Sequence, residues 1–223
     1  MKKIILFSII FLFAIHNIIA QGTKAAEATN SNKYLQAMEK NIKSLDTVSS
    51  AGSFHNLANN FERIANAEKN KWEPFYYAAY CYAVMALMSD KASIDMLADK
   101  ADSYLKQAIL LSDNSETSVL AAMIHACRIM VDPISRFQIN GLESAAFLEK
   151  AKVQNPANPR PYFLQAKTQL KIPESMGGGK KIAKSTLESA IEKFKAFIPA
   201  NSIAPNWGYQ QARASLEQIN KEQ

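Results

Sequence analysis

The chain has 223 residues, of which 48% are hydrophobic and 21% are charged, and its formal net charge is +6 at pH 7. A chain of this length and composition can bury one continuous hydrophobic core. Its lysines are scattered among acidic residues, and no dense basic block is interleaved with aromatic residues. The charge pattern therefore excludes an electrostatic footprint for nucleic acid, and we expect no nucleic-acid partner.

The first twenty residues have the pattern of a secretory signal peptide. Two lysines precede the apolar run from Ile4 to Ile15, and the small residue Ala20 suits the position before a cleavage site. We predict a signal peptide over 1–20, a flexible leader over 21–32 and one helical domain over 33–223. An uncleaved membrane anchor is the alternative, and the apolar run is short for a bilayer span. We expect an exported chain, periplasmic or secreted, with no stable membrane insertion after cleavage.

Two cysteines, Cys81 and Cys127, would enter an oxidising compartment. They could form a disulfide, which would restrict the unfolded chain. Each lies inside an apolar helical run, however, where cysteine usually behaves as a small buried hydrophobic residue. The sequence leaves both states open and favours buried free thiols.

An internal repeat organises the rest of the chain. Phe61, Leu105, Leu148 and Leu187 occupy the same position in similar segments, spaced 44, 43 and 39 residues apart. Further helical runs lie between these segments, at Trp72 to Met88, Thr117 to Met130, Pro161 to Lys171 and Asn206 to Asn220. Apolar residues from Ile94 to Ile109 follow a period of about 3.6, and no segment shows strand-like alternation. The pattern predicts an all-α protein.

The repeat resembles the tetratricopeptide repeat, a helix–turn–helix unit. The second-helix signature of small, large apolar and small residues reads Ala101, Leu105 and Ala108, then Ser144, Leu148 and Ala151, then Ala183, Leu187 and Ala190. The first-helix signature is matched by Phe75, Ala79 and Tyr82. The resemblance implies a right-handed α-solenoid of stacked antiparallel helix pairs, with about three full units and terminal half-units. The units here are longer than the usual 34 residues, which leaves related helical solenoids as an alternative name.

A glycine-rich stretch, Gly177 to Gly179, precedes the helical run that starts at Lys180. A phosphate-binding loop would need glycine where Glu174 lies and a hydroxyl where Lys181 lies, and it would follow a strand. The stretch therefore predicts a turn between two paired helices, because glycine permits positive φ.

The supply of catalytic and metal-binding residues is poor. Asp95, Asp99 and Asp102 share one helix face, which we interpret as a solvated face and not as a cation site. His125 and Cys127 are two residues apart and so point to different sides of a helix. No local catalytic signature appears. We expect no enzyme activity, no metal and no cofactor.

In tetratricopeptide repeats the ligand lies on the concave surface formed by the first helices. Carried over by the resemblance, this surface comprises Tyr76, Tyr80, Val84, Ile124, Arg128, Phe163, Lys167 and Lys171. Aromatic and positively charged side chains together would suit an extended acidic peptide or a chain's C-terminal carboxylate. The opposing interpretation is that these lysines and arginines are merely solvated.

The sequence therefore predicts an exported, non-enzymatic helical-repeat scaffold that binds another protein or a peptide, possibly an acidic one. The alternative is a periplasmic module that binds a small molecule or a glycan, with Tyr76, Tyr80 and Phe163 as stacking surfaces. A long open basic groove would favour the peptide, whereas a closed aromatic pocket would favour the small ligand. The pattern leaves the oligomeric state open.

Overall fold

The structure, a computed structural model, describes residues 31–221. The predicted signal peptide lies outside the described residues, as does the predicted leader apart from its last two residues. Those two residues, Ser31 and Asn32, are helical, in a helix whose described part spans 31–45. Tyr34 and Met38 of this helix are buried in the core and so dock it on the rest of the chain.

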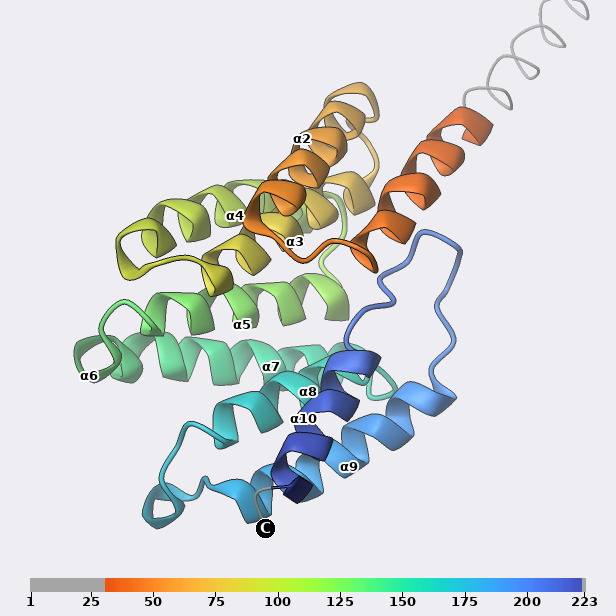
Figure 1. Cartoon of the computed structure of the whole chain (residues 1–223). Helices are drawn as coiled ribbons and strands as arrows, with labels where there is room; N and C mark the ends of the chain where they lie inside the picture. The colour runs from red at the N-terminus through yellow and green to blue at the C-terminus, as the bar shows by residue number, and fades with distance from the viewer. Residues whose placement is uncertain (1–30, 222–223) are drawn as a thin grey trace, which may run out of the picture.

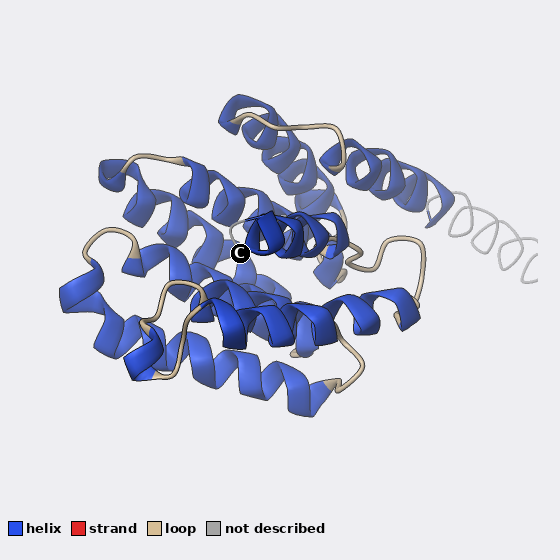
Figure 2. Cartoon of the chain, turned by 60° about the horizontal axis from the view of Figure 1, so that its bottom comes forward, coloured by secondary structure: helices blue, strands red, loops and turns tan. Residues whose placement is uncertain are grey.

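Every regular element in the described residues is helical (Figure 2). After the first helix, the chain forms α2 (Ala51–Ala67), α3 (Trp72–Met88), α4 (Lys91–Leu111), α5 (Ser115–Ile129), α6 (Pro133–Arg136), a π-helical turn η1 (Phe137–Gly141), α7 (Leu142–Gln154), α8 (Arg160–Gln169), a 3-10 turn η2 (Glu174–Met176), α9 (Lys180–Ala196) and α10 (Tyr209–Lys221). The all-α prediction is confirmed. Within residues 31–221, no helix combines the length and the apolar character that a membrane crossing requires.

Several helices begin at a residue whose side chain accepts a hydrogen bond from an otherwise unpaired backbone N–H. Ser50 caps α2, Asp90 caps α4, and Asn114 caps α5 in a reciprocal capping box with Thr117. Such caps typically stabilise a helix by about 1 kcal/mol each. These helices therefore begin directly after polar residues that can act as N-caps.

The core is centred on α3, which packs against α2, α4 and α5 (Figure 1). Its side chains are buried nearly all round the helix, including Tyr76, Tyr77 and Cys81. A helix covered on several sides needs such an apolar surface, and the aromatic run Trp72–Met88 supplies it. The rings of Tyr77 and Phe61 stack with centroids 5.0 Å apart, joining α3 to α2.

Consecutive helices pack in pairs: α3 with α4, α5 with α7, and α8 with α9. In addition, α5 contacts both α3 and α4, and α8 contacts α5 and α7. The repeated small and large apolar residues are buried at these contacts: Ala101, Leu105, Ala108, Ser144, Leu148, Ala151, Ala183, Leu187 and Ala190. Small residues at the crossing points allow the helix axes to approach closely.

The glycine-rich stretch forms the turn between α8 and α9, as predicted. Gly177 has φ of 84° and Gly179 has φ of 93°, both in the region that favours glycine. Gly178 is needed for a different reason, because a Cβ atom there would overlap the backbone oxygen of Ile172. The stretch is a structural turn that follows a helix and not a strand.

Cys81 and Cys127 are both buried and unbridged. The Cys127 thiol donates to the backbone oxygen of Ala83 on α3, with a sulfur–oxygen distance of 3.6 Å. Burial raises the pKa of the Cys81 thiol well above its usual range and that of Cys127 to about 12. The structure thus agrees with the favoured interpretation of buried free thiols.

A long connection, residues 197–208, joins α9 to α10 and is here called the strap. It leaves the end of α9, returns toward α3 and ends at the start of α10 (Figure 1). Within the strap, Ile203 and Pro205 are buried. The strap thereby connects the C-terminal helices to the N-terminal half of the chain.

Candidate functional site

The predicted concave groove is partly filled by the strap. Tyr76 has no exposed surface, and its hydroxyl accepts a 2.8 Å hydrogen bond from Nε1 of Trp207. The Tyr80 and Trp207 rings lie 5.0 Å apart at an interplanar angle of 31°. Burial raises the pKa of both tyrosines, which therefore stay neutral. Tyr76 cannot meet a peptide in this arrangement, because Trp207 of the same chain already occupies that place.

The predicted positive charge of Arg128 is already paired. Its guanidinium lies 2.8 Å from Asp99 and 2.7 Å from Asp102 on α4. Burial disfavours its charge, but the hydrogen bonds to these carboxylates outweigh burial and raise its pKa. Asp95, on the same helix face, pairs with Arg136 at 2.6 Å. The three aspartates thus pair with two arginines, so the predicted solvated face is a partly exposed ion-pair cluster.

The other predicted groove residues differ widely in exposure. Ile124 is fully buried, Phe163 is buried with its ring 6.4 Å from that of Phe194, and Val84 is half-buried. Lys167 on α8 and Lys171, two residues after its end, are exposed. Although the Lys167 side chain reaches solvent, nearby protein atoms partly desolvate its amino group, and this desolvation and secondly the charge of Lys171 lower its pKa. The predicted set therefore does not form one open groove lined by aromatic and basic side chains.

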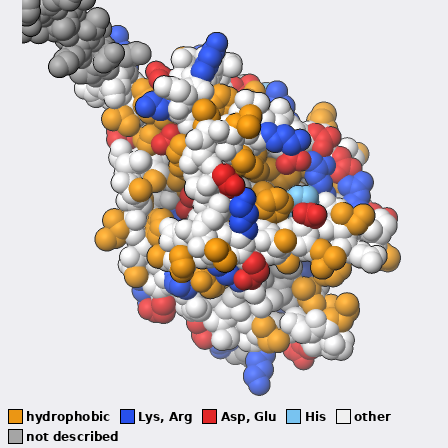
Figure 3. Space-filling model, turned by 180° about the vertical axis from the view of Figure 1, so that it is seen from behind, with side chains coloured by type: hydrophobic (Ala, Val, Ile, Leu, Met, Phe, Trp, Pro, Cys, Tyr) orange, Lys and Arg blue, Asp and Glu red, His pale blue; other side chains and the backbone are white. Residues whose placement is uncertain are grey.

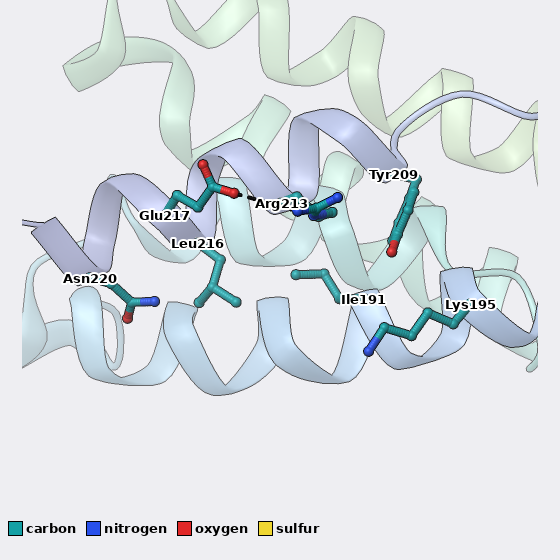
Figure 4. A pocket seen from close by; sticks show the side chains of 7 residues that line it. All are labelled: Ile191, Lys195, Tyr209, Arg213, Leu216, Glu217 and Asn220. Carbon is teal, nitrogen blue, oxygen red and sulfur yellow. Dashed lines mark ion pairs between the residues drawn. The ribbon is translucent and has the colours of Figure 1, made fainter.

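A pocket of about 310 Å³ lies instead between α9 and α10 (Figure 4). Its lining consists of Ile191 and Lys195 from α9 and of Tyr209, Arg213, Leu216, Glu217 and Asn220 from α10. This volume is at the lower end of the range for small-molecule sites. The pocket combines an apolar floor with charged groups at its rim.

The apolar part is supplied by Ile191 and Leu216, which point into the space between the two helices (Figure 4). Ile191 belongs to a small core cluster that also contains Ala190 and Ala212, and the partly buried Leu216 packs against that cluster. Tyr209 closes one end of the pocket, and its ring lies 5.9 Å from that of Phe194. An aromatic ring beside aliphatic side chains offers a flat surface on which a planar ligand can stack.

The charged part is supplied by Lys195 and Arg213. Lys195 pairs with Glu192 at 2.7 Å, and that hydrogen bond raises its pKa. The Arg213 guanidinium lies 3.8 Å from Glu217 and 6.0 Å from the centre of the Tyr209 ring. These pairs are exposed, so they are weak and could exchange their carboxylate for that of a ligand. The rim can therefore bind an anionic group.

Lys195, Tyr209 and Arg213 are not among the binding residues predicted from the sequence. The sequence predicts a helix over the C-terminal run 206–220, but none of the predicted site residues lies on it. Tyr209, Arg213 and Leu216 follow the spacing i, i+4 and i+7, which places them on one side of a helix. That amphipathic spacing was the signal that could have revealed one wall of the pocket.

A metal centre built from side chains is not seen in the described part of the chain, where no group of three His, Cys, Asp or Glu side chains could hold a metal ion. Charges of both signs are interspersed with hydrophobic side chains on the face that Figure 3 shows. That face therefore carries no extended patch of one sign.

Among solved structures, the chain is similar to the HusA haemophore from Porphyromonas gingivalis. The sequence identity is 37% and the TM-score is 0.76, over 85% of this chain and 94% of that one. The chain belongs to the family of this haemophore. Protein-family models and curated proteins give no match.

This relationship overturns the predicted scaffold function. The similar protein is a haemophore, which binds haem, so its family favours the alternative of a small-molecule-binding protein. A haemophore is a binding protein and not an enzyme, in keeping with the lack of a local catalytic signature. The scaffold prediction failed because a repeat pattern in a sequence predicts an architecture and not a ligand.

Proposed function

We propose that this chain is an exported protein that binds haem or a related porphyrin in the pocket between α9 and α10. The observation that carries the proposal is the 37% identity to a haemophore over nearly the whole length of that protein. At that identity and coverage, the family relationship makes haem the first ligand to test.

The pocket residues fit the chemistry of haem, which is a planar apolar macrocycle with two carboxylate side chains. Ile191 and Leu216 would contact the macrocycle, and Tyr209 would stack on it or offer its phenol oxygen. Tyrosine oxygen is a known haem-iron ligand in proteins. Lys195 and Arg213 would pair with the carboxylates. Part of the ring would remain exposed, because the pocket is small and open to solvent on the side of these charges.

The export and repeat predictions belong to the same proposal. A haemophore as relative supports export of the chain, and the predicted signal peptide over 1–20 would provide it. We further propose that the pairs α3–α4, α5–α7 and α8–α9 are tetratricopeptide-like units. Their consecutive packing and the buried signature residues Leu105, Leu148 and Leu187 support that interpretation.

The proposal is tested by titrating the chain from residue 21 onward with haemin and following the haem absorbance band. We expect saturable binding with one site, and we expect Leu216→Asp to weaken it at least tenfold. The matched control is Leu110→Asp, at a leucine that is 79% exposed on α4 and distant from the pocket in the chain. Absence of saturable binding would sink the proposal, and equal loss in both variants would sink the assignment to this pocket.

A further inference from the structure

The strap joins the two walls of the pocket. It begins directly after the end of α9, which carries Lys195, and it ends directly before Tyr209, the first residue of α10. Besides packing directly on α9, α10 is tethered by the strap, so the place where the strap is held also bears on the position of α10. Side chains from α3 and α8 hold it, and these side chains do not line the pocket.

Three hydrogen bonds fix the second half of the strap, from Ile203 to Trp207. Tyr77 Oη donates to the backbone oxygen of Ile203 at 3.1 Å, and Arg160 Nη2 donates to the backbone oxygen of Pro205. Trp207 Nε1 donates to Tyr76 Oη at 2.8 Å. These partners are buried or half-buried, so leaving one of them without its hydrogen bond is unfavourable.

Arg160 is held rigidly and touches the strap in more than one place. Its side chain is fully buried, and its Nη1 lies 2.8 Å from Glu116 Oε1. The guanidinium carbon lies 5.0 Å from the centre of the Phe197 ring and 5.5 Å from that of Trp207. A buried planar cation between two rings can fix both ends of the strap at once.

The junction between the strap and α10 is tight. Gly208 has φ of 109°, and a Cβ atom there would lie 2.7 Å from the Phe194 ring. That ring in turn contacts Tyr209, with the centroids 5.9 Å apart. A displacement of Trp207 would therefore also displace Tyr209, because only Gly208 separates the two residues and Gly208 and Tyr209 both contact the Phe194 ring.

We propose that Tyr76, Tyr77 and Arg160 are positioning residues for the α9–α10 pocket, acting through the strap to hold α10 against α9. The inference rests on the proposed function for the identity of the ligand, but the mechanical relationship is a property of the chain alone. α10 is then held against α9 in two ways: by a ligand bound between the two helices, and by the strap, which α3 holds. Such coupling is reciprocal: haemin protects the strap, and the strap strengthens haemin binding.

The first test uses variants that remove one hydrogen bond and keep the ring. Trp207→Phe removes the donor to Tyr76, and Tyr77→Phe removes the donor to Ile203. The matched control is Tyr82→Phe. Tyr82 lies on α3, as Tyr77 does, and the substitution removes its 2.7 Å hydrogen bond to Glu62 on α2. We expect haemin to bind about tenfold more weakly, and to dissociate faster, in the first two variants only. Equal affinity in all three variants, or equal loss, would overturn the inference.

The second test needs no haemin, so it separates this inference from the proposed function. Spin labels at Ser189→Cys on α9 and Ala214→Cys on α10, both exposed positions, report the separation of the two helices. We expect a narrow distance distribution that broadens in Trp207→Phe and Tyr77→Phe but not in Tyr82→Phe. An unchanged distribution would overturn the positioning role even if haemin binds.

Hydrogen exchange adds a readout that a merely structural role would not move. With haemin added to the parent chain, we expect slower exchange of strap amides, including Ile203, and unchanged exchange in α2. If haemin binds and strap exchange is unaffected, the coupling is absent. If haemin fails to bind while the spin-label distances respond as expected, the positioning role stands and the proposed ligand is wrong.

Discussion

The indole Nε1 of Trp207 donates a 2.8 Å hydrogen bond to the hydroxyl of Tyr76, across 131 residues of sequence. This contact places the end of the strap against the central helix α3. It also explains why Tyr76, which family resemblance assigned to a ligand-binding surface, is fully buried. Part of the surface that we predicted to bind a partner is covered by the chain itself.

Tyr76→Ala should lower the free energy of unfolding by about 3–5 kcal/mol, as expected for a large aromatic side chain removed from a core. It also leaves the Trp207 donor without a partner. Urea denaturation followed by circular dichroism measures the change. Tyr162→Ala is the comparison, since Tyr162 is only half-buried and should cost less. A smaller effect of Tyr76→Ala than of Tyr162→Ala would contradict the central role of this contact.

Reversing the charges at the pocket rim should weaken haemin binding. Lys195→Glu combined with Arg213→Glu would repel the carboxylates of haem, and we expect about a tenfold loss, because exposed ion pairs contribute up to about 1 kcal/mol each. Affinity of the parent chain should also fall as salt is raised, by charge screening. Fluorescence quenching titrations at low and high salt measure both effects.

The control for this experiment is Arg63→Glu combined with Lys69→Glu, which makes the same change in net charge at exposed positions near the end of α2. We expect it to leave haemin affinity within about twofold. If this pair weakens binding as much as the rim pair, net charge and not the pocket is responsible.

The turn between α8 and α9 should tolerate substitution unevenly. Gly178→Ala forces a Cβ atom into the backbone of Ile172, and we expect it to cost more than the roughly 1 kcal/mol of strain at Gly177→Ala, where the added atom meets open space. Gly52→Ala, within helix α2, should be neutral or stabilising by up to about 1 kcal/mol. Melting temperatures give the order, and a reversed order would argue against this turn geometry.

Stability should depend on pH through Glu116. Burial raises its pKa to about 7, against the opposing effects of Arg160 and Asn158. Because the folded pKa lies above the unfolded one, the folded chain binds the proton more tightly. This contribution is full below about pH 4.5 and is lost as pH rises toward 7, on the order of 1–3 kcal/mol in all.

Urea denaturation between pH 4.5 and 7.5 measures that dependence. Glu116→Gln removes the titrating group, so its unfolding free energy should change less over this interval than that of the parent chain. Parallel pH profiles for the two proteins would show that Glu116 does not titrate in this range.

Cys81 and Cys127 should both be unreactive in the folded protein and both react after unfolding. Their thiols are buried, and burial raises both pKa values, so little thiolate is available. Ellman's reagent should detect almost no thiol in the folded protein in buffer. In guanidinium, without a reductant, it should detect both thiols. Detection of thiols only after reduction would instead reveal a disulfide.

Much of the fold follows from local patterns that the sequence displays. The 3.6-residue period from Ile94 to Ile109 and the apolar run Trp72–Met88 indicate helices, because each helix must bury an apolar stripe. Polar caps such as Asn114 and the glycines before Lys180 set where helices begin and end. These signals are local, so they can be recognised without knowing which helices pack against each other.

The site could not be read in this way, because its walls come from two helices, α9 and α10, whose packing the local patterns do not specify. The sequence by itself determined the all-α architecture, the spacing of the helix pairs and the poor supply of catalytic residues. Only the tertiary structure decided that Trp207 would cover Tyr76, that Asp99 and Asp102 would pair with Arg128, and that Lys195 and Tyr209 would meet across a pocket. The physical reason is that burial and ion pairing depend on which side chains, distant in sequence, pack against a residue. The residues that flank it in the sequence do not specify those contacts.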